Sequence, residues 1–142
     1  MSRQAETAVE NYRSGCNCAQ AVLCACVQES GLDPAQAYRL MEGFGGGCGG
    51  MQEVCGALAG AFAAISFKNS DGKQQGGTTK AATAQMIRRA AELYRAEFGG
   101  ITCRDILHNQ PPRPQKCADK VRRAAEVAQE VFRENETAEH RG

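Results

Sequence analysis

The longest apolar segment of the chain reads VCGALAGAFAAISF and covers residues 54–67. It carries no charged side chain, so a helix formed from it has no polar face to turn toward water and must be buried on nearly all sides. It is shorter than the roughly 20 residues that cross a bilayer. We therefore expect a buried helix over Met51–Phe67, with Gly56 and Gly60 on one face, where a neighbouring helix or a bound group can approach the backbone.

Helical periodicity dominates the rest of the chain, without strand-like alternation of useful length. Asp33-Pro34 combines an N-cap with proline at the first helical position, and Thr102 to Asp105 resembles a capping box. The sequence predicts an all-α, compact single-domain bundle of about six helices over residues 1–142, with a buried central helix and a frayed tail at 135–142. The segments expected around the central helix are Arg3–Tyr12, Cys18 to before Gly31, Pro34 to Met41 or Glu42, Thr78–Phe98, the short Cys103–Leu107, and Gln115–Glu134.

Composition narrows the class of protein. The formal net charge is +1 with acidic and basic residues intermixed, which is not the basic footprint of a nucleic-acid-binding protein. The N-terminal stretch MSRQAETAVENYRSG lacks the apolar core of a secretory signal. We therefore expect a cytoplasmic protein that binds no nucleic acid and inserts into no membrane.

The eight cysteines are the feature that points to chemistry. In a protein without an export signal, metal binding or catalytic redox chemistry is more common than structural disulfides. The chain has two histidines, too few for a His-rich metal site. The cysteines are Cys16, Cys18, Cys24, Cys26, Cys48, Cys55, Cys103 and Cys117.

Four of these cysteines are expected at helix starts: Cys18, Cys55, Cys103 and Cys117. A helix N-terminus presents unpaired N–H groups and a partial positive charge, both of which favour thiolate over thiol. A lowered thiol pKa makes cysteine a better redox centre or metal ligand. These four are therefore the candidate catalytic and metal-ligating residues, provided that the four helix ends meet in space.

Three interpretations of the four thiols stay open. They ligate an iron–sulfur cluster or another thiophilic metal, they cycle between dithiol and disulfide, or they are inert buried thiols. Ferredoxin motifs have closely spaced cysteines, unlike these four. No Cys-x-x-Cys lies in a βαβ context, which weighs against simple disulfide exchange.

The glycine-rich loop GFGGGCGG, residues 43–50, precedes the central helix. No strand leads into it and Gly-Lys-Ser/Thr is absent, so we expect a tight turn rather than a nucleotide site. Cys48 is the best additional candidate, as a resolving thiol or a further ligand. If a cofactor binds, we expect Gly47, Cys48, Gly56 and Gly60 to contact it.

The remaining candidates have plain structural alternatives. Cys16-x-Cys18 and Cys24-x-Cys26 have the spacing of soft-metal clamps, but Cys26 falls on an apolar stripe and is expected in the core, whereas Cys24 is expected to be exposed. His108, five residues after Cys103, is a candidate fifth ligand or proton donor, but a loop residue is the more common role; Arg104 is a candidate for favouring thiolate at Cys103, but a structural salt bridge with a neighbour is expected.

Several motifs together resemble a family of redox-active proteins named for its C…CGAxxG…C…C pattern. The resemblance covers roughly Tyr12 to Phe132, and it assigns the four characteristic cysteines to the same helix-start residues. It implies a redox role, and related domains in split-Soret cytochromes imply an iron–sulfur cluster. Cys16, Cys24, Cys26 and Cys48 are additions to the common pattern. The motifs are NCAQAV (17–22), GFGGG (43–47), CGALAG (55–60) and CRDIL (103–107).

The sequence thus predicts a redox-active protein that uses cysteines at helix N-termini for electron transfer, with an iron–sulfur cluster as the expected cofactor. The alternatives are thiol–disulfide exchange and a thiophilic-metal-binding module without turnover. A redox partner protein is expected, and a homodimer is one assembly in keeping with the sequence. Enzymatic turnover, the pairing of the cysteines and the reduction potential stay open.

Overall fold

The computed structural model describes residues 2–28, 30–108 and 117–141, and the side chains of 137–141 are not described. Within these ranges the chain forms seven α-helices and one 3₁₀ turn, and its one β feature is an isolated bridge. The all-α prediction is confirmed, with seven helices where about six were expected. The elements are α1 (Arg3–Arg13), α2 (Cys18–Cys26), α3 (Pro34–Met41), η1 (Glu42–Phe44), α4 (Gly56–Asn69), α5 (Lys80–Phe98), α6 (Cys103–His108) and α7 (Cys117–Arg141).

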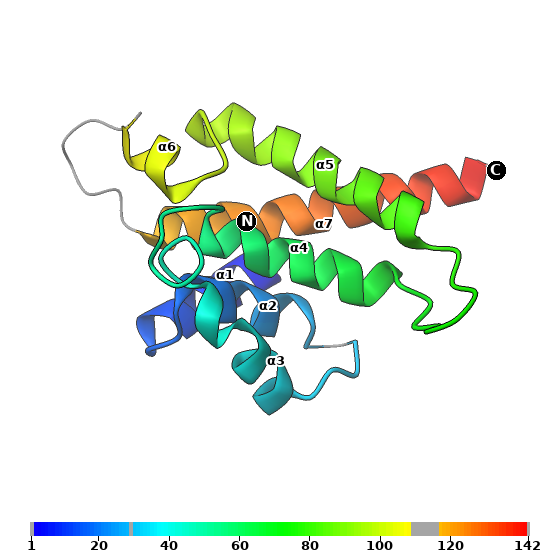
Figure 1. Ribbon diagram of the computed structural model, residues 1–142, viewed down its shortest axis with the longest axis horizontal. Helices are drawn as coiled ribbons and strands as arrows, with labels where there is room; N and C mark the ends of the chain where they lie inside the picture. Colours follow the sequence, from blue (N-terminus) through cyan, green and yellow to red (C-terminus); the bar gives the residue numbers. More distant parts are fainter. Residues whose placement is uncertain (1, 29, 109–116, 142) are drawn as a thin grey trace.

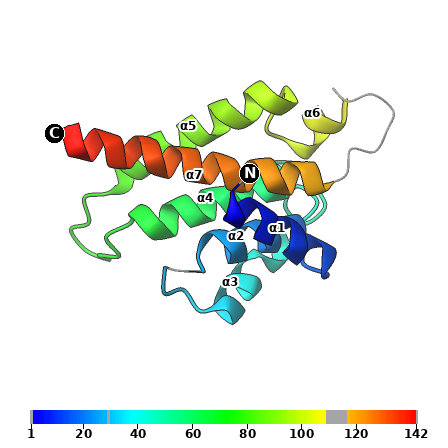
Figure 2. The same ribbon diagram turned by 180° about the vertical axis from the view of Figure 1, so that it is seen from behind.

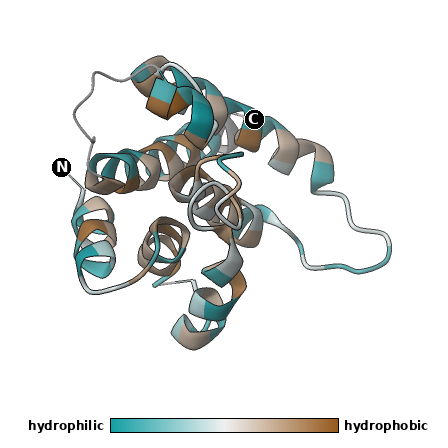
Figure 3. Cartoon of the chain, turned by 60° about the vertical axis from the view of Figure 1, so that its left-hand side comes forward, coloured by the Kyte–Doolittle hydropathy of each residue, from teal (hydrophilic) through white to brown (hydrophobic). Residues whose placement is uncertain are grey.

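Helix α4 lies at the centre of the bundle. It packs on α2 on one side and on α5 and α7 on the other, while α1 and α3 cover α2 (Figures 1 and 2). Apolar residues concentrate along α2 and α4, where the helices face each other (Figure 3). Leu58 and Ile65 of α4 are fully buried, which confirms the prediction of a buried central helix.

The crossing of α2 over α4 depends on two glycines. A Cβ on Gly60 would lie 2.6 Å from the carbonyl oxygen of Ala19 and 3.0 Å from Cβ of Val22. A Cβ on Gly56 would lie 2.5 Å from Sγ of Cys18. The two helix backbones can approach this closely because glycine has no side chain.

Helix α4 begins at Gly56, not at Met51 as predicted. The preceding loop holds residues 46–50 at positive φ, with values from 63° to 75°. Residues 52–55 then pair with residues 101–104, so their backbone groups are not available to a helix. The sequence showed the glycines but not this long-range pairing.

Helix α2 ends at Cys26, which is before Gly31 as predicted, and α5 begins at Lys80 rather than near Thr78. Helix α7 continues to Arg141, into the segment for which the sequence predicts a frayed tail. No Gly or Pro interrupts residues 135–141, and Glu134 accepts hydrogen bonds from Nε of Arg89 at 3.0 and 3.1 Å. The predicted start at Gln115 lies outside the described residues.

Replacing Gly60 by Ala should destabilise the fold by about 1–3 kcal/mol, because the added methyl overlaps a backbone oxygen that cannot rotate away. Urea unfolding measures this change. Gly43→Ala is the matched control, because nothing lies within 4 Å of its Cβ position, and its effect should stay within about 0.5 kcal/mol. Equal stabilities for the two variants would contradict the close α2–α4 contact.

Candidate functional site

A short backbone pairing brings Cys55 and Cys103 to the same place. Val54 and Thr102 form an antiparallel bridge. On either side of it, the N–H of Cys55 donates to the carbonyl of Ile101 at 2.8 Å, and the N–H of Cys103 donates to the carbonyl of Glu53 at 2.7 Å. The bridge therefore fixes the N-terminal ends of α4 and α6 beside each other.

Polar side chains hold the N-terminus of α2 in place. Asn17 caps the helix, since its Oδ1 accepts from the N–H of Gln20 at 2.8 Å while Oε1 of Gln20 accepts from the N–H of Asn17 at 2.9 Å. Nδ2 of Asn17 donates to the carbonyl of Glu42 at 3.1 Å, and Nε2 of Gln20 donates to the carbonyl of Tyr38 at 3.0 Å. Cys18, the first helical residue, therefore has a fixed position against Gly56.

The four helix-start thiols form a closed ring of neighbours. Cys18 is close enough to Cys55 and to Cys117 for each negative charge to raise its pKa. Cys103 has the same relation to Cys55 and Cys117. Each of the four is thus within range of the charge of two others, so the four helix ends lie in one region of the molecule.

The pKa values correct one part of the prediction. Helix N-termini were expected to lower the thiol pKa, but the pKa of Cys18 lies above its ordinary value of 9.0, first because of burial and then because of Cys55. The pKa of Cys103 is raised by the same two causes, in the same order. Hydrogen bonding from the backbone of Gly46 opposes the shift at Cys18, and the charge of Lys120 opposes it at Cys103. The rise in pKa that burial causes is larger than the decrease that these contacts cause.

Two tyrosines contact the ring. The hydroxyl of Tyr94 lies 3.1 Å from Sγ of Cys55, and both residues are buried. A hydrogen bond with Cys117, followed by burial and the charges of Cys117 and Cys18, raises the pKa of Tyr12 to about 12. Burial, then Cys55, raises the pKa of Tyr94 well above 10.0. Both phenols therefore keep their protons and can donate them to sulfur.

Sequence reasoning missed Tyr94 and Lys120 as site residues. Tyr94 shares a buried face of α5 with Met86 and Ala90, at four-residue spacing, a pattern that indicates a core position but not what the hydroxyl meets. Lys120 is buried, although lysine side chains are mostly exposed. Its spacing of three residues from Cys117 is the signal that could have identified it.

The glycine-rich loop is an ordered structure rather than a simple tight turn. The N–H groups of the loop and of the residues after it donate to carbonyls three to six residues earlier, for example Gly49 to Gly43 at 2.7 Å and Glu53 to Gly47 at 2.9 Å. Cys48 itself has φ of 67°, a conformation that is uncommon for a residue with a side chain. Gly47 is buried against Gln52, so its glycine is needed for packing within the loop.

The other candidates have different neighbours. Sγ of Cys48 is 3.9 Å from the carbonyl of Val54. Burial, and then the charge of Cys16, raises the pKa of Cys24, which is half-buried rather than exposed as predicted. Cys26 is a core residue, as predicted, and burial raises its pKa to about 12. Gly60 contacts the backbone of α2, so its observed role is helix packing.

The predicted salt bridge of Arg104 is confirmed, and its partner is Glu53, at 3.3 Å in an exposed ion pair. His108 is exposed but is the last residue of α6, so the loop position expected for it is wrong.

No three His, Cys, Asp or Glu side chains in the described part of the chain are arranged to hold a single metal ion. All eight cysteines are free thiols. No three of the four ring thiols are therefore placed to hold one metal ion together.

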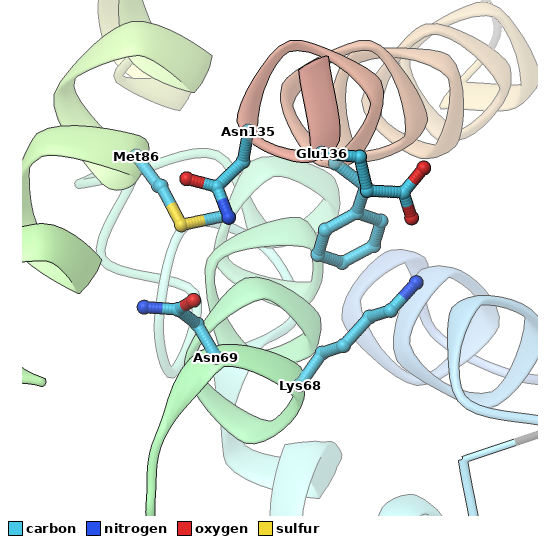
Figure 4. Close-up of a pocket in the computed structure, with 6 residues that line it drawn as sticks. Lys68, Asn69, Met86, Asn135 and Glu136 are labelled. Atoms are coloured by element: carbon cyan, nitrogen blue, oxygen red, sulfur yellow. The ribbon is translucent and has the colours of Figure 1, made fainter. Parts of the chain in front are cut away.

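A cavity of about 170 Å³ lies elsewhere, at the C-terminal end of α4 (Figure 4). There the ammonium of Lys68 sits 4.2 Å from the ring centroid of Phe132. Since α4 rises about 1.5 Å per residue, this cavity is roughly 20 Å from the thiols at the other end. It is not part of the thiol site.

Among the described residues, no helix has the length and the apolar character that crossing a membrane requires. No curated protein and no solved structure matches the chain. A family model described as "Putative redox-active protein (C_GCAxxG_C_C)" matches residues 16–131, a range that includes all four ring cysteines. The chain therefore belongs to the C_GCAxxG_C_C family of redox-active proteins.

Proposed function

We propose that this protein transfers electrons through an iron–sulfur cluster held by the thiolates of Cys18, Cys55, Cys103 and Cys117. The observation that carries the proposal is the closed ring of these four thiols, each at the start of a different helix. Four cysteine thiolates are the common ligand set of both two-iron and four-iron clusters. In a cluster the ligands bind different metal atoms, so thiols that are not placed to share one ion suit it better than they suit a single ion such as zinc.

The charges around the ring also suit an anionic cluster. Buried thiolates cost free energy unless positive groups compensate them. Here the four cysteines lie at helix N-termini, which carry partial positive charge, the backbone of Gly46 hydrogen-bonds to the sulfur of Cys18, and the positive charge of Lys120 opposes the rise in the pKa of Cys103. The raised pKa values of Cys18 and Cys103 describe thiols without metal, which is the state that a bound cation would convert to thiolate.

When bound, a cluster supplies reversible one-electron transfer, and the residues of the chain adjust how readily it occurs. Tyr94 donates its hydroxyl proton toward the sulfur of Cys55, which stabilises added negative charge. Cys55, which is 2% exposed, lies on the side that excludes water. Cys103 and Cys117 are half-buried, so electrons would enter and leave on their side of the ring.

Protein prepared without oxygen should contain iron and acid-labile sulfide and absorb visible light. Cys55→Ser should lose most of the iron, because it removes one of four ligands. Elemental analysis, sulfide assay and visible spectroscopy measure these quantities.

Cys24→Ser is the matched control, since Cys24 is half-buried on α2 but outside the ring, and it should keep the iron of the wild type. Colourless wild-type protein after anaerobic reconstitution with iron and sulfide would reject the cluster. Equal iron in the two serine variants would reject the assignment of Cys55.

Removing the phenol hydroxyl should change the reduction potential without removing the cluster. Tyr94→Phe keeps the ring but loses the hydrogen bond to Cys55, so the potential should fall by about 20–60 mV, the equivalent of about 0.5–1.5 kcal/mol for one electron. A spectroelectrochemical titration measures it. Tyr38→Phe, which changes an exposed tyrosine on α3, should leave the potential at the wild-type value. A potential that rises in Tyr94→Phe would contradict the role given to the hydroxyl.

Thiol–disulfide exchange is the second candidate, and the half-exposure of Cys103 and Cys117 favours it. The thiolate of Cys103 would attack one sulfur of a partner disulfide, forming a mixed disulfide and releasing the other partner sulfur as thiolate. Cys117 would then attack the mixed disulfide and release the second partner thiol. The partner gains two electrons, and the Cys103–Cys117 pair is left as a disulfide.

In this second function the rate should rise with pH through the ordinary thiol range. Because burial and Cys55 raise the pKa of Cys103, little thiolate is present at pH 7, and the rate should still be increasing at pH 9. The reaction of metal-free protein with a small aromatic disulfide measures this, with Cys103→Ser to identify the phase and Cys48→Ser as a control that retains it. A plateau below pH 8 in that phase would contradict the raised pKa.

A further inference from the structure

The cavity at the C-terminal end of α4 lies between three helices of the bundle. It has a volume of about 170 Å³ and is lined by two residues of α4, one of α5 and three of α7, which are Lys68, Asn69, Met86, Phe132, Asn135 and Glu136. Ligand sites in helical proteins commonly lie between helices, and a cavity of about 150 Å³ holds a benzene-sized molecule. The cavity can therefore accept a small organic molecule.

The charged and uncharged parts of the lining lie on different sides. Lys68 and Glu136 lie at one side of the cavity, and Asn69, Met86 and Asn135 lie at the other (Figure 4). Met86 is buried, so its thioether forms an apolar wall between α4 and α5 rather than an outer surface. A ligand with a charged end and an uncharged end matches this arrangement.

The two charged groups have no ion-pair partner within the described part of the chain. The ring of Phe132 holds the ammonium of Lys68 at the cavity, 4.2 Å from the ring centroid. The next charged groups, Arg89 and Glu134, line an adjoining cavity and already pair with each other at 3.0 Å. Lys68 and Glu136 thus give the charged side of the cavity one unpaired positive group and one unpaired negative group.

We propose that this cavity binds a free α-amino acid with an uncharged side chain. Such a molecule carries a carboxylate and an ammonium on one carbon atom, so the carboxylate pairs with Lys68 and the ammonium with Glu136. The side chain of the ligand extends toward Met86 and lies against Phe132. A ligand with a single charge leaves either Lys68 or Glu136 without a partner.

The test uses the whole chain with ¹³C in the methyl groups of its four methionines. L-Leucine is the probe, and two analogues each lack one of its charges: isocaproate has no ammonium, and isoamylamine has no carboxylate. NMR follows the methyl signal of Met86 during each titration. The signals of Met41 and Met51, which are outside the cavity lining, are the internal references.

We expect leucine to shift the Met86 signal saturably, with a Kd on the order of 1 mM for a ligand of this size. Each analogue should bind about three- to fivefold more weakly, because it lacks one exposed ion pair. In Lys68→Met, leucine should bind no better than isoamylamine, and in Glu136→Gln it should bind no better than isocaproate. Lys73→Met is the matched control, since Lys73 is an exposed lysine outside the cavity lining, and it should keep the wild-type affinities.

Three results would overturn the proposal. The first is the absence of a saturable Met86 shift up to roughly 20 mM leucine. The second is equal affinity for leucine and both analogues, which would leave a cavity that accepts apolar groups without recognising charge. The third is a loss of affinity in Lys73→Met as large as that in Lys68→Met, which would assign the effect to net charge.

The two charge variants test the two ends of the ligand separately, so the proposal stays testable if one of them does not fold. Wild-type signals of Met41 and Met51 show that a variant is folded. None of these outcomes depends on whether the protein holds iron, so the amino-acid site and the proposed function stand or fall independently.

Discussion

The close contact between α2 and α4 is the constraint on which the rest of the molecule depends. Gly60 lets the backbone of α2 lie against α4, and Gly56 leaves room for the thiol of Cys18 at the start of α4. Any side chain at either glycine would separate the two helices at the level of the sulfur ring. The contact between α2 and α4 that closes the core therefore also determines where the thiols of Cys18 and Cys55 meet.

The other two thiols depend on features outside the helical core. The bridge between Val54 and Thr102 ties α6 to the start of α4, and α7 delivers Cys117 beside Tyr12. The glycine-rich loop allows the bridge to form. Its run of positive φ values turns the chain after η1 within a few residues, so that the residues from 52 onward can pair. The loop thus serves the site by directing the chain, and its Gly46 also contributes a hydrogen bond to Cys18.

Two opposing electrostatic effects act on the ring. Helix N-termini favour thiolate, whereas burial and the neighbouring thiols favour the neutral form. For Cys18 and Cys103 the second effect is larger. Under the function proposed above, a cationic group bound among the thiols would offset both the cost of burial and the repulsion among sulfurs. The phenols of Tyr94 and Tyr12 and the ammonium of Lys120 supply the donors and the charge that such a site needs.

The sequence by itself determined the all-α class, the buried central helix and the helix-start positions of the four cysteines. The all-α class depends on local periodicity, and the buried helix depends on the uncharged run before Lys68. The helix starts depend on local signals, including capping residues such as Thr102. It also identified Gly56 and Gly60 as points of close approach. Only the tertiary structure decided that the four helix ends lie in one region, that α4 starts at Gly56, and that Tyr94 and Lys120 belong to the site. These features depend on contacts between residues far apart in the chain, and on burial, which reversed the pKa change expected from helix ends alone.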